Sequence, residues 1–321
     1  MAVRNWSRWL LAMLFGGCLV SSAMGQAWNG TRFSLSGEER PAQARQAEQR
    51  PDANAPPLQV AGRSDLEQLR VGLAAPQPNE HPLMPVLRWA HEGLRHIEDI
   101  PDYTAIMVKR ERVDGKLSEP AYMFIKVRQK PFSVYMTFLK PESLKGQEVI
   151  FIPSVNNGRM LAHGTGIKKM FGTVSLDPTG PIAMKGNRYP ITELGLSNLV
   201  HRLIEQGEKD AKYGECEVKF FPGAKINNRL CTCVQVVHPV PRRNFLFHLA
   251  RIFVDDEINV PVRFESYEWP AKAGGSPEMT EEYTYLNLKL NVGLTDADFD
   301  THNPNYGFKD ANKAHATSAS R

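Results

Sequence analysis

Histidines and nucleophilic or acidic residues are the side chains with which this chain could perform acid–base or nucleophilic chemistry. The histidines are dispersed, and His163, His201, His238 and His248 can meet only through the fold. The sequence contains no G-x-S-x-G, H-E-x-x-H or Walker motif. GTGIKKMFG at 164–172 lacks both the Walker spacing and the Ser or Thr after Lys. We therefore expect no enzymatic activity and no cofactor.

The acidic clusters do not have the spacing of a metal site or of a catalytic carboxylate pair. The run 255–257 with Asn259 lacks the alternating oxygen ligands and the distant Glu of an EF loop, so it is typical of a turn between strands. Glu281 and Glu282 are adjacent, and neighbours in a strand point to opposite faces. We expect no metal site from either cluster.

The N-terminus has the layout of a secretory signal peptide. Two arginines and no acid precede the apolar run 9–20, and small residues follow at 21–27. Cleavage after Gly25 is expected, which removes residues 1–25 and places the protein in the periplasm or another extracytoplasmic space. The apolar run is shorter than the roughly 20 residues that a membrane-spanning helix needs. Cys18, which follows Phe-Gly-Gly, keeps lipid anchoring open as an alternative.

Three cysteines remain after this cleavage. Cys231 and Cys233 lie two apart in a predicted strand, on one face, with Cα atoms near the upper limit for a bridge. A disulfide from Cys216 to one of them is favoured over a disulfide between the two. Three small buried side chains in a sheet, without a disulfide, are favoured over either bond.

Composition excludes some classes of protein. The chain has 42% hydrophobic residues, enough for a packed core, so a fully disordered chain is excluded. Its 39 basic and 35 acidic residues give a net charge of only +4, spread along the sequence. A nucleic-acid partner requires a clustered basic face, and we expect none.

The elements that would position these residues begin after a polar leader. Residues 26–81 are rich in Gln, Ala, Pro and Glu and predict a disordered linker. From Pro82, apolar residues at steps of three and four predict a helix of about four turns, and a second amphipathic helix is predicted at 192–207. About ten antiparallel strands complete a domain at 82–300, which a polar tail at 301–321 follows.

The strands have one continuously apolar face. With a two-residue loop at 129–130, the cross-strand pairs are Val127 with Phe132, Ile125 with Val134, Met123 with Met136, and Ala121 with Phe138. Ten strands are hard to bury as a flat sheet. We therefore predict an α+β fold in which the sheet curls around a helix.

The segment 164–190 interrupts the strands with apolar residues set among glycines and prolines, as expected of a loop that covers a cavity. Methionines in such a loop adapt to irregular apolar partners. We predict that a cavity is lined by strand residues with two residues of this loop above them: Met123, Ile125, Val134, Met136, Phe138, Met170 and Phe171. A solid core is the alternative.

Several motifs carry a family resemblance. Lys130-Pro131 precedes an F-x-V-x-M strand, an Asn157-Gly158 turn precedes a short strand, and two closing segments follow at 255–270 and 285–299. In these features residues 83–300 resemble a family of secreted bacterial proteins known only as a domain of unknown function. More distantly, they resemble periplasmic lipoprotein carriers of the LolA type and related mycobacterial lipid-binding lipoproteins.

The resemblance implies a half-open antiparallel β-barrel with helices on its concave side and an apolar cavity for acyl chains. The insert at 164–190 departs from the carriers. We expect an extracytoplasmic carrier or sensor that binds a lipid or a lipid-modified protein, with an envelope protein as a further partner class. An envelope scaffold with a solid core and no ligand is the alternative function.

Overall fold

The strands of the computed structural model form one antiparallel sheet that is open at both ends. The structure describes residues 77–166, 172–214, 216–272 and 274–308. In this part the sheet has 12 strands in the order β7-β6-β5-β4-β3-β1-β12-β11-β10-β9-β8, with β2 paired to β1. The strands are β1 (Asp102–Val113), β2 (Lys116–Leu117), β3 (Ala121–Arg128), β4 (Ser133–Lys140), β5 (Glu148–Phe151), β6 (Met160–His163), β7 (Thr173–Leu176), β8 (Glu217–Ile226), β9 (Arg229–Val237), β10 (Leu249–Asp255), β11 (Pro261–Glu268) and β12 (Glu278–Leu290).

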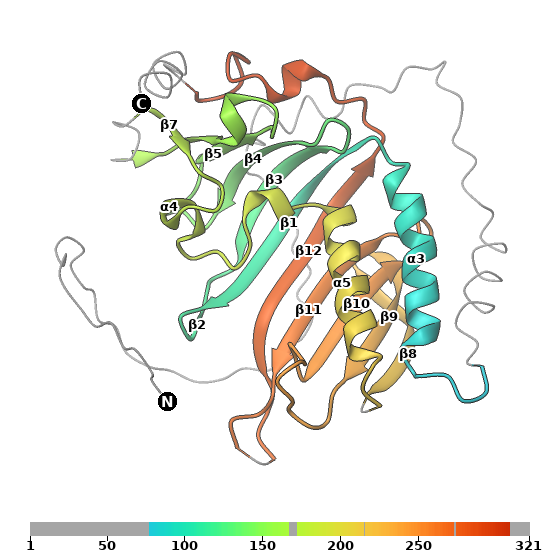
Figure 1. Cartoon of the computed structure of the whole chain (residues 1–321). Coiled ribbons are helices and arrows are strands. Elements are labelled where there is room, and N and C mark those ends of the chain that lie inside the picture. The colour runs from blue at the N-terminus through green and yellow to red at the C-terminus, as the bar shows by residue number, and fades with distance from the viewer. Residues whose placement is uncertain (1–76, 167–171, 215, 273, 309–321) are drawn as a thin grey trace. The chain divides into compact units, whose positions relative to one another are not determined.

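Two long helices lie on one face of this sheet, as Figure 1 shows. They are α3 (Met84–Glu98) and α5 (Leu196–Asp210), and the short helical elements are α4 (Pro181–Met184), η1 (Asn156–Gly158), η3 (Ile191–Glu193) and η4 (Asp296–Phe299). The apolar stripes of α3 and α5 pack with alternate residues of the strands in one large cluster, including Leu87, Ile97, Leu199 and Val234. The sheet curls around these helices. The predicted α+β fold, a half-open barrel with helices on its concave side, is confirmed.

The opposite, convex face carries a second apolar cluster. Tyr135, Ile150 and Leu161 alternate with strand residues of the concave face and pack with Phe299, Tyr306 and Phe308 of the segment after β12. Tyr306 stacks on Tyr135 with ring centroids 4.0 Å apart. The packed chain therefore extends to residue 308, beyond the boundary predicted at residue 300, because three aromatic residues cover this face.

The predicted register of the hairpin β3–β4 is wrong by two residues. Val127 pairs with Val134, Ile125 with Met136, and Met123 with Phe138. The loop that joins the strands spans 129–132 rather than two residues. A shift of two keeps every side chain on its own face, so the predicted apolar face is retained.

Cys216, Cys231 and Cys233 are all free and buried, in agreement with small core side chains and not with a disulfide from Cys216. Cys216 belongs to the concave cluster with Val234 of β9. Cys231 and Cys233 alternate with Val234 and therefore face the convex side of the same strand. Side chains on opposite faces of a sheet cannot be bridged.

The acidic run 255–257 forms a turn between strands, as predicted. The Asp255 carboxylate accepts hydrogen bonds from the backbone N–H groups of Glu257 (2.9 Å) and Ile258 (3.2 Å) and pairs with Arg229. Asn259 Oδ1 accepts a hydrogen bond from Trp89 Nε1 at 3.0 Å, which joins this turn to α3.

The predicted signal peptide at 1–25 lies outside the described residues, as do the linker up to residue 76 and the tail from residue 309. Within the described chain, no helix is long and apolar enough to cross a membrane.

Candidate ligand pocket

A cavity of about 250 Å³ on the concave side is here called the main pocket. It lies between α5, the segment 178–195 and the strands β1, β3, β4, β11 and β12. This volume is close to the lower end of the roughly 300–1,000 Å³ that ligand pockets occupy, and it exceeds the roughly 150 Å³ that accommodates benzene in an engineered apolar cavity.

The floor of the main pocket is apolar and rich in methionine. Cross-strand pairing places Met107 beside Met123 and Met123 beside Phe138, and the next row places Met136 beside Val149. Alternation along each strand points this set to the concave face. Met160, Phe264 and Tyr285 extend the same apolar floor. Methionine side chains adjust to irregular apolar partners, which suits a variable acyl chain.

The roof of the main pocket is α5, whose entry is fixed by Tyr103. The Leu196 backbone N–H donates to the Tyr103 hydroxyl oxygen at 3.0 Å, and Tyr103 is buried. Gly195 precedes the helix with φ 120°, and a Cβ there would lie 3.1 Å from that hydroxyl oxygen. Glycine is therefore required where α5 begins. The helix then presents Leu199, Leu203 and Gln206 to the pocket.

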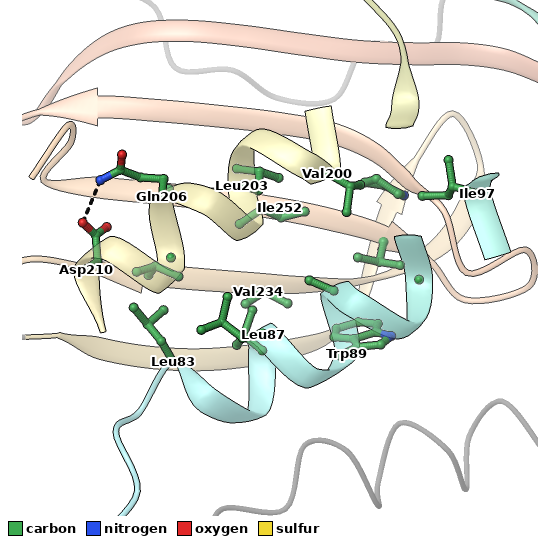
Figure 2. Close-up of a pocket in the computed structure, with 18 of the residues that line it drawn as sticks. Leu83, Leu87, Trp89, Ile97, Val200, Leu203, Gln206, Asp210, Val234 and Ile252 are labelled. Atoms are coloured by element: carbon green, nitrogen blue, oxygen red, sulfur yellow. Dashed lines mark hydrogen bonds between the residues drawn. The ribbon is translucent and has the colours of Figure 1, made fainter. Parts of the chain in front are cut away.

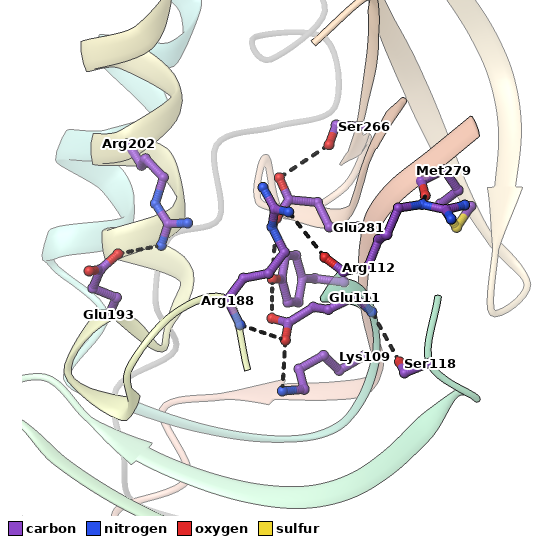
Figure 3. A network of polar contacts seen from close by, with 11 residues as sticks. Lys109, Glu111, Arg112, Ser118, Arg188, Glu193, Arg202, Ser266, Met279 and Glu281 are labelled. Atoms are coloured by element: carbon purple, nitrogen blue, oxygen red, sulfur yellow. Dashed lines mark hydrogen bonds and ion pairs between the residues drawn. The ribbon is translucent and has the colours of Figure 1, made fainter. Parts of the chain in front are cut away.

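One end of the main pocket is polar, and Figure 3 shows its network. Glu111 of β1 lies opposite Glu281 of β12 in the register, and both carboxylates are buried. Glu111 accepts hydrogen bonds from the Tyr283 hydroxyl at 2.5 Å, Lys109 Nζ at 3.2 Å and the Arg188 backbone N–H at 3.0 Å. Glu281 accepts from Ser266 Oγ at 3.1 Å and pairs with Arg188 Nε at 3.3 Å.

The charges at this end compensate one another. Two buried carboxylates directly opposite each other would destabilise the sheet, and the Lys109 ammonium and Arg188 guanidinium lie beside them. Burial, followed by the charges of Glu281 and Glu111, raises the pKa of Tyr283 well above its usual range. Tyr283 therefore remains a neutral phenol that donates its proton to Glu111.

A cationic side chain of α5 closes the edge of this polar end. The Arg202 guanidinium lies over the Tyr189 ring, 3.6 Å from its centroid, and donates to Glu193 Oε2 at 2.8 Å. Tyr189, Glu193 and Arg202 all line the pocket. The main pocket thus has an apolar floor and a polar end with charges of both signs, the arrangement that an amphiphilic ligand requires.

A second cavity of about 100 Å³, the side pocket, lies on the other flank of α5 (Figure 2). Its walls are apolar side chains of α3, α5, β9 and β10, among them Leu87, Val234 and Ile252. Leu203, Gln206 and Phe247 line both cavities. Because Leu203 and Gln206 belong to α5, a movement of this helix would change both volumes.

Of the residues predicted to line a cavity, Met123, Met136 and Phe138 line the main pocket. Ile125 and Val134 lie on the same face but are fully buried (0% exposed) and line neither cavity. Met170 and Phe171 lie outside the described residues.

The segment predicted as a cover does border the main pocket, through its described part. Pro178, Ala183 and Tyr189 contribute to the lining. Ile182 of the same segment is 73% exposed.

The sequence did not single out Met107, although the alternation of β1 places it on the predicted face. It also missed the polar end, because Glu111, Arg188 and Glu281 come from distant parts of the chain. Glu281 and Glu282 do point to opposite faces, as predicted: Glu281 lines the pocket, and Glu282 pairs with Arg263 at 3.0 Å.

A family model described as "Protein of unknown function (DUF1571)" matches residues 100–308. No curated protein matches the sequence. The solved structures that are similar include lipoprotein LppX of Mycobacterium tuberculosis, with 11% identity and a TM-score of 0.38. The match covers 67% of this chain and 98% of the LppX chain. A LolA superfamily protein from Nitrosomonas europaea has 11% identity and a TM-score of 0.27, covering 66% of this chain and 97% of its own. A DUF1329 family protein from Desulfovibrio piger has 12% identity and a TM-score of 0.34, covering 68% of this chain and 98% of its own.

Proposed function

This chain belongs to the DUF1571 family of proteins of unknown function, and from its main pocket we propose that it is an extracytoplasmic carrier or sensor. Its ligand is the acyl chain of a lipid or of a lipid-modified protein. The extracytoplasmic location rests on the signal-peptide layout of residues 1–25.

The observation that carries the proposal is the division of the main pocket into an apolar floor and a polar end. An acyl chain on the floor of Met107, Met123 and Met136 would gain about 0.8 kcal/mol for each methylene removed from water. The head of the same molecule would reach Lys109 and Arg188, which supply charged donors at the far end.

We propose binding without catalysis. The ionisable groups of the pocket are engaged with one another: Glu111 with Lys109 and the hydroxyl of Tyr283, and Glu281 with Arg188 and Ser266. Such a network positions a ligand head by hydrogen bonds, whereas a general base needs a lone pair directed at its substrate.

The test is native mass spectrometry with lipid extraction, on exported protein purified from the host periplasm without detergent. A co-purifying amphiphile at near-unit stoichiometry is expected, and its extraction identifies the ligand class. A ligand-free mass that stays unchanged after incubation with fatty acids and phospholipids would overturn the proposal and favour an envelope scaffold.

A further inference from the structure

Two segments border the mouth of the main pocket and expose apolar side chains there. The loop 239–247 joins β9 to β10, and its Leu246 lines the pocket while remaining 62% exposed. Val240 of the same loop is 47% exposed. The segment 178–190 contributes Ala183 to the lining, and its neighbour Ile182 is 73% exposed. Leu246 is thus exposed at the pocket itself, and Val240 and Ile182 are exposed on the two segments that border it.

The loop 239–247 is held in place, so this exposure is built into the fold. Phe245 is buried and stacks on the His238 ring, with centroids 4.0 Å apart. The hairpin is closed by the His238 backbone N–H, which donates to the His248 carbonyl oxygen at 2.8 Å. Gln206 of α5 donates to the Asn244 carbonyl oxygen at 3.4 Å. With Phe245 turned inward, Leu246 is held outward.

The same two segments are basic. The loop 239–247 contains Arg242 and Arg243, the segment 178–190 contains Lys185 and Arg188, and neither contains Asp or Glu. Arg188 is paired with Glu281 inside the pocket, whereas Lys185 and Arg243 are exposed. Exposed aliphatic groups interspersed with basic side chains are the pattern with which proteins bind an anionic membrane surface.

We propose that Ile182, Lys185, Val240, Arg243 and Leu246, here called the docking patch, bind an anionic lipid bilayer and so bring the mouth of the main pocket against lipid. The charge of the two segments selects an anionic surface over a neutral one. Contact at the mouth would also let an acyl chain pass between bilayer and pocket without exposing its methylenes to water. This inference rests on the proposed carrier function and adds to the main pocket a surface that binds the membrane.

The experiment is flotation of the full exported protein with two kinds of vesicle. One is phosphatidylcholine alone, and the other is equal parts of phosphatidylcholine and phosphatidylglycerol. We expect the protein to float with the anionic vesicles at low salt and to be released as salt increases. Absence of flotation with anionic vesicles, or equal flotation with both kinds, would overturn the proposal.

Substitutions locate the contact. Arg243→Gln and Lys185→Gln are each expected to weaken partition to anionic vesicles about fivefold. One basic residue near an anionic surface contributes about 1 kcal/mol of binding free energy, which corresponds to this factor. Ile182→Ser should weaken it as well. The matched controls are Lys225→Gln and Leu230→Ser, which replace exposed residues of β8 and β9 that line neither pocket. Equal losses for patch and control variants would assign the binding to another surface.

These measurements test membrane docking and ligand binding independently, so either proposal can be overturned without the other. Arg243, Lys185 and Ile182 do not line the main pocket, so their variants should retain the ligand stoichiometry of the native protein in mass spectra. Flotation without a bound ligand would remove the carrier function and leave the docking patch. A bound ligand without flotation would remove the docking patch and leave the carrier function.

Discussion

His238 Nε2 lies 3.4 Å from Asp210 Oδ2, and both side chains are buried from solvent. His238 Nδ1 lies 3.1 Å from the Phe247 carbonyl oxygen, which can only accept, so Nδ1 carries a proton. Nε2 and Oδ2 would then repel unless a second proton lies between them. The pair lies where the end of α5 meets the base of the hairpin loop 239–247, and Gln206, which lines both pockets, donates to Asp210 Oδ1 at 2.7 Å.

The pair predicts a pH-dependent effect of Asp210→Asn. Burial raises the pKa of Asp210 to about 6 from its ordinary 3.8. The folded protein therefore favours the protonated carboxyl, and the stability that this proton contributes is full below pH 3.8 and is lost as pH rises through 6. Asn does not titrate. We therefore expect the stability of the variant, relative to the native protein, to increase by about 2 kcal/mol between pH 4 and pH 7.

Urea unfolding at a series of pH values measures this difference. Burial lowers the pKa of His238 below its ordinary 6.5. The stability that neutral His238 contributes is therefore present above pH 6.5 and is lost as pH falls through the lowered pKa. Both proteins contain His238, so its contribution largely cancels in the comparison. A difference in stability that is constant from pH 4 to pH 7 would contradict the raised pKa of Asp210.

The polar end of the main pocket predicts a large effect of Lys109→Met. The Lys109 ammonium is beside Glu111, whose carboxylate is buried opposite Glu281. Without that charge, two buried carboxylates are left with one nearby cation, Arg188, and we expect a loss of about 3 kcal/mol. The exposed pair of Lys145 with Glu142 is the control, and Lys145→Met should cost less than about 1 kcal/mol.

Thermal and urea unfolding compare these two variants. A second substitution, Glu111→Leu in the Lys109→Met background, should restore part of the lost stability, because it removes one of the uncompensated carboxylates. Equal effects of Lys109→Met and Lys145→Met would show that the network contributes little.

Alternation along single strands allowed much of this fold to be predicted, and it identified Met123, Met136 and Phe138 on the concave face. The strand β7 was missed, because Thr173–Leu176 is short and set among glycines and prolines. The polar end was missed for a different reason. Glu111 and Glu281 are ordinary acidic residues until the pairing of β1 with β12 places them opposite each other.

The apolar floor predicts that a bulky residue will exclude the ligand. Met136→Trp places a larger side chain on the floor between Ile125 and Val149, its cross-strand partners. We expect the ligand stoichiometry in native mass spectra to fall several-fold, with a destabilisation of about 1–3 kcal/mol from overpacking. Met84→Trp is the matched control, because Met84 is exposed at the start of α3 and lines neither pocket.

The complementary variant of the floor is Phe138→Ala, which enlarges the pocket. Its melting temperature should change little, since Phe138 is only partly buried, while ligand affinity should decrease with the lost apolar contact. Normal ligand stoichiometry in both Met136→Trp and Phe138→Ala would place the ligand elsewhere.

The entry of α5 predicts opposite effects for two glycine substitutions. Gly195→Ala puts a Cβ at φ 120° and 3.1 Å from the Tyr103 hydroxyl oxygen, so we expect a loss of about 1–3 kcal/mol. Gly93→Ala lies inside α3 with nothing within 4 Å of the new Cβ, and it should stabilise by up to about 1 kcal/mol. Urea unfolding measures both. A neutral Gly195→Ala would mean that α5 adjusts its entry freely.

The convex face predicts a change in stability that leaves the pocket intact. Tyr306 stacks on Tyr135, and its hydroxyl donates to the Asp298 carbonyl oxygen at 2.8 Å. Tyr306→Ala should cost about 3 kcal/mol or more, because it uncovers the apolar cluster of Tyr135, Ile150 and Leu161. Tyr306→Phe keeps the stacked ring and loses one hydrogen bond, so about 1 kcal/mol is expected.

Urea unfolding measures these losses, and native mass spectrometry measures the bound ligand in the same samples. The Tyr306 cluster and the main pocket lie on opposite faces of β4, since Tyr135 alternates with Met136. Ligand stoichiometry should therefore stay at the native value in both variants wherever they are folded. Loss of ligand from folded Tyr306→Ala would show that the two faces are coupled through the strand, and the convex segment would then belong to the binding machinery.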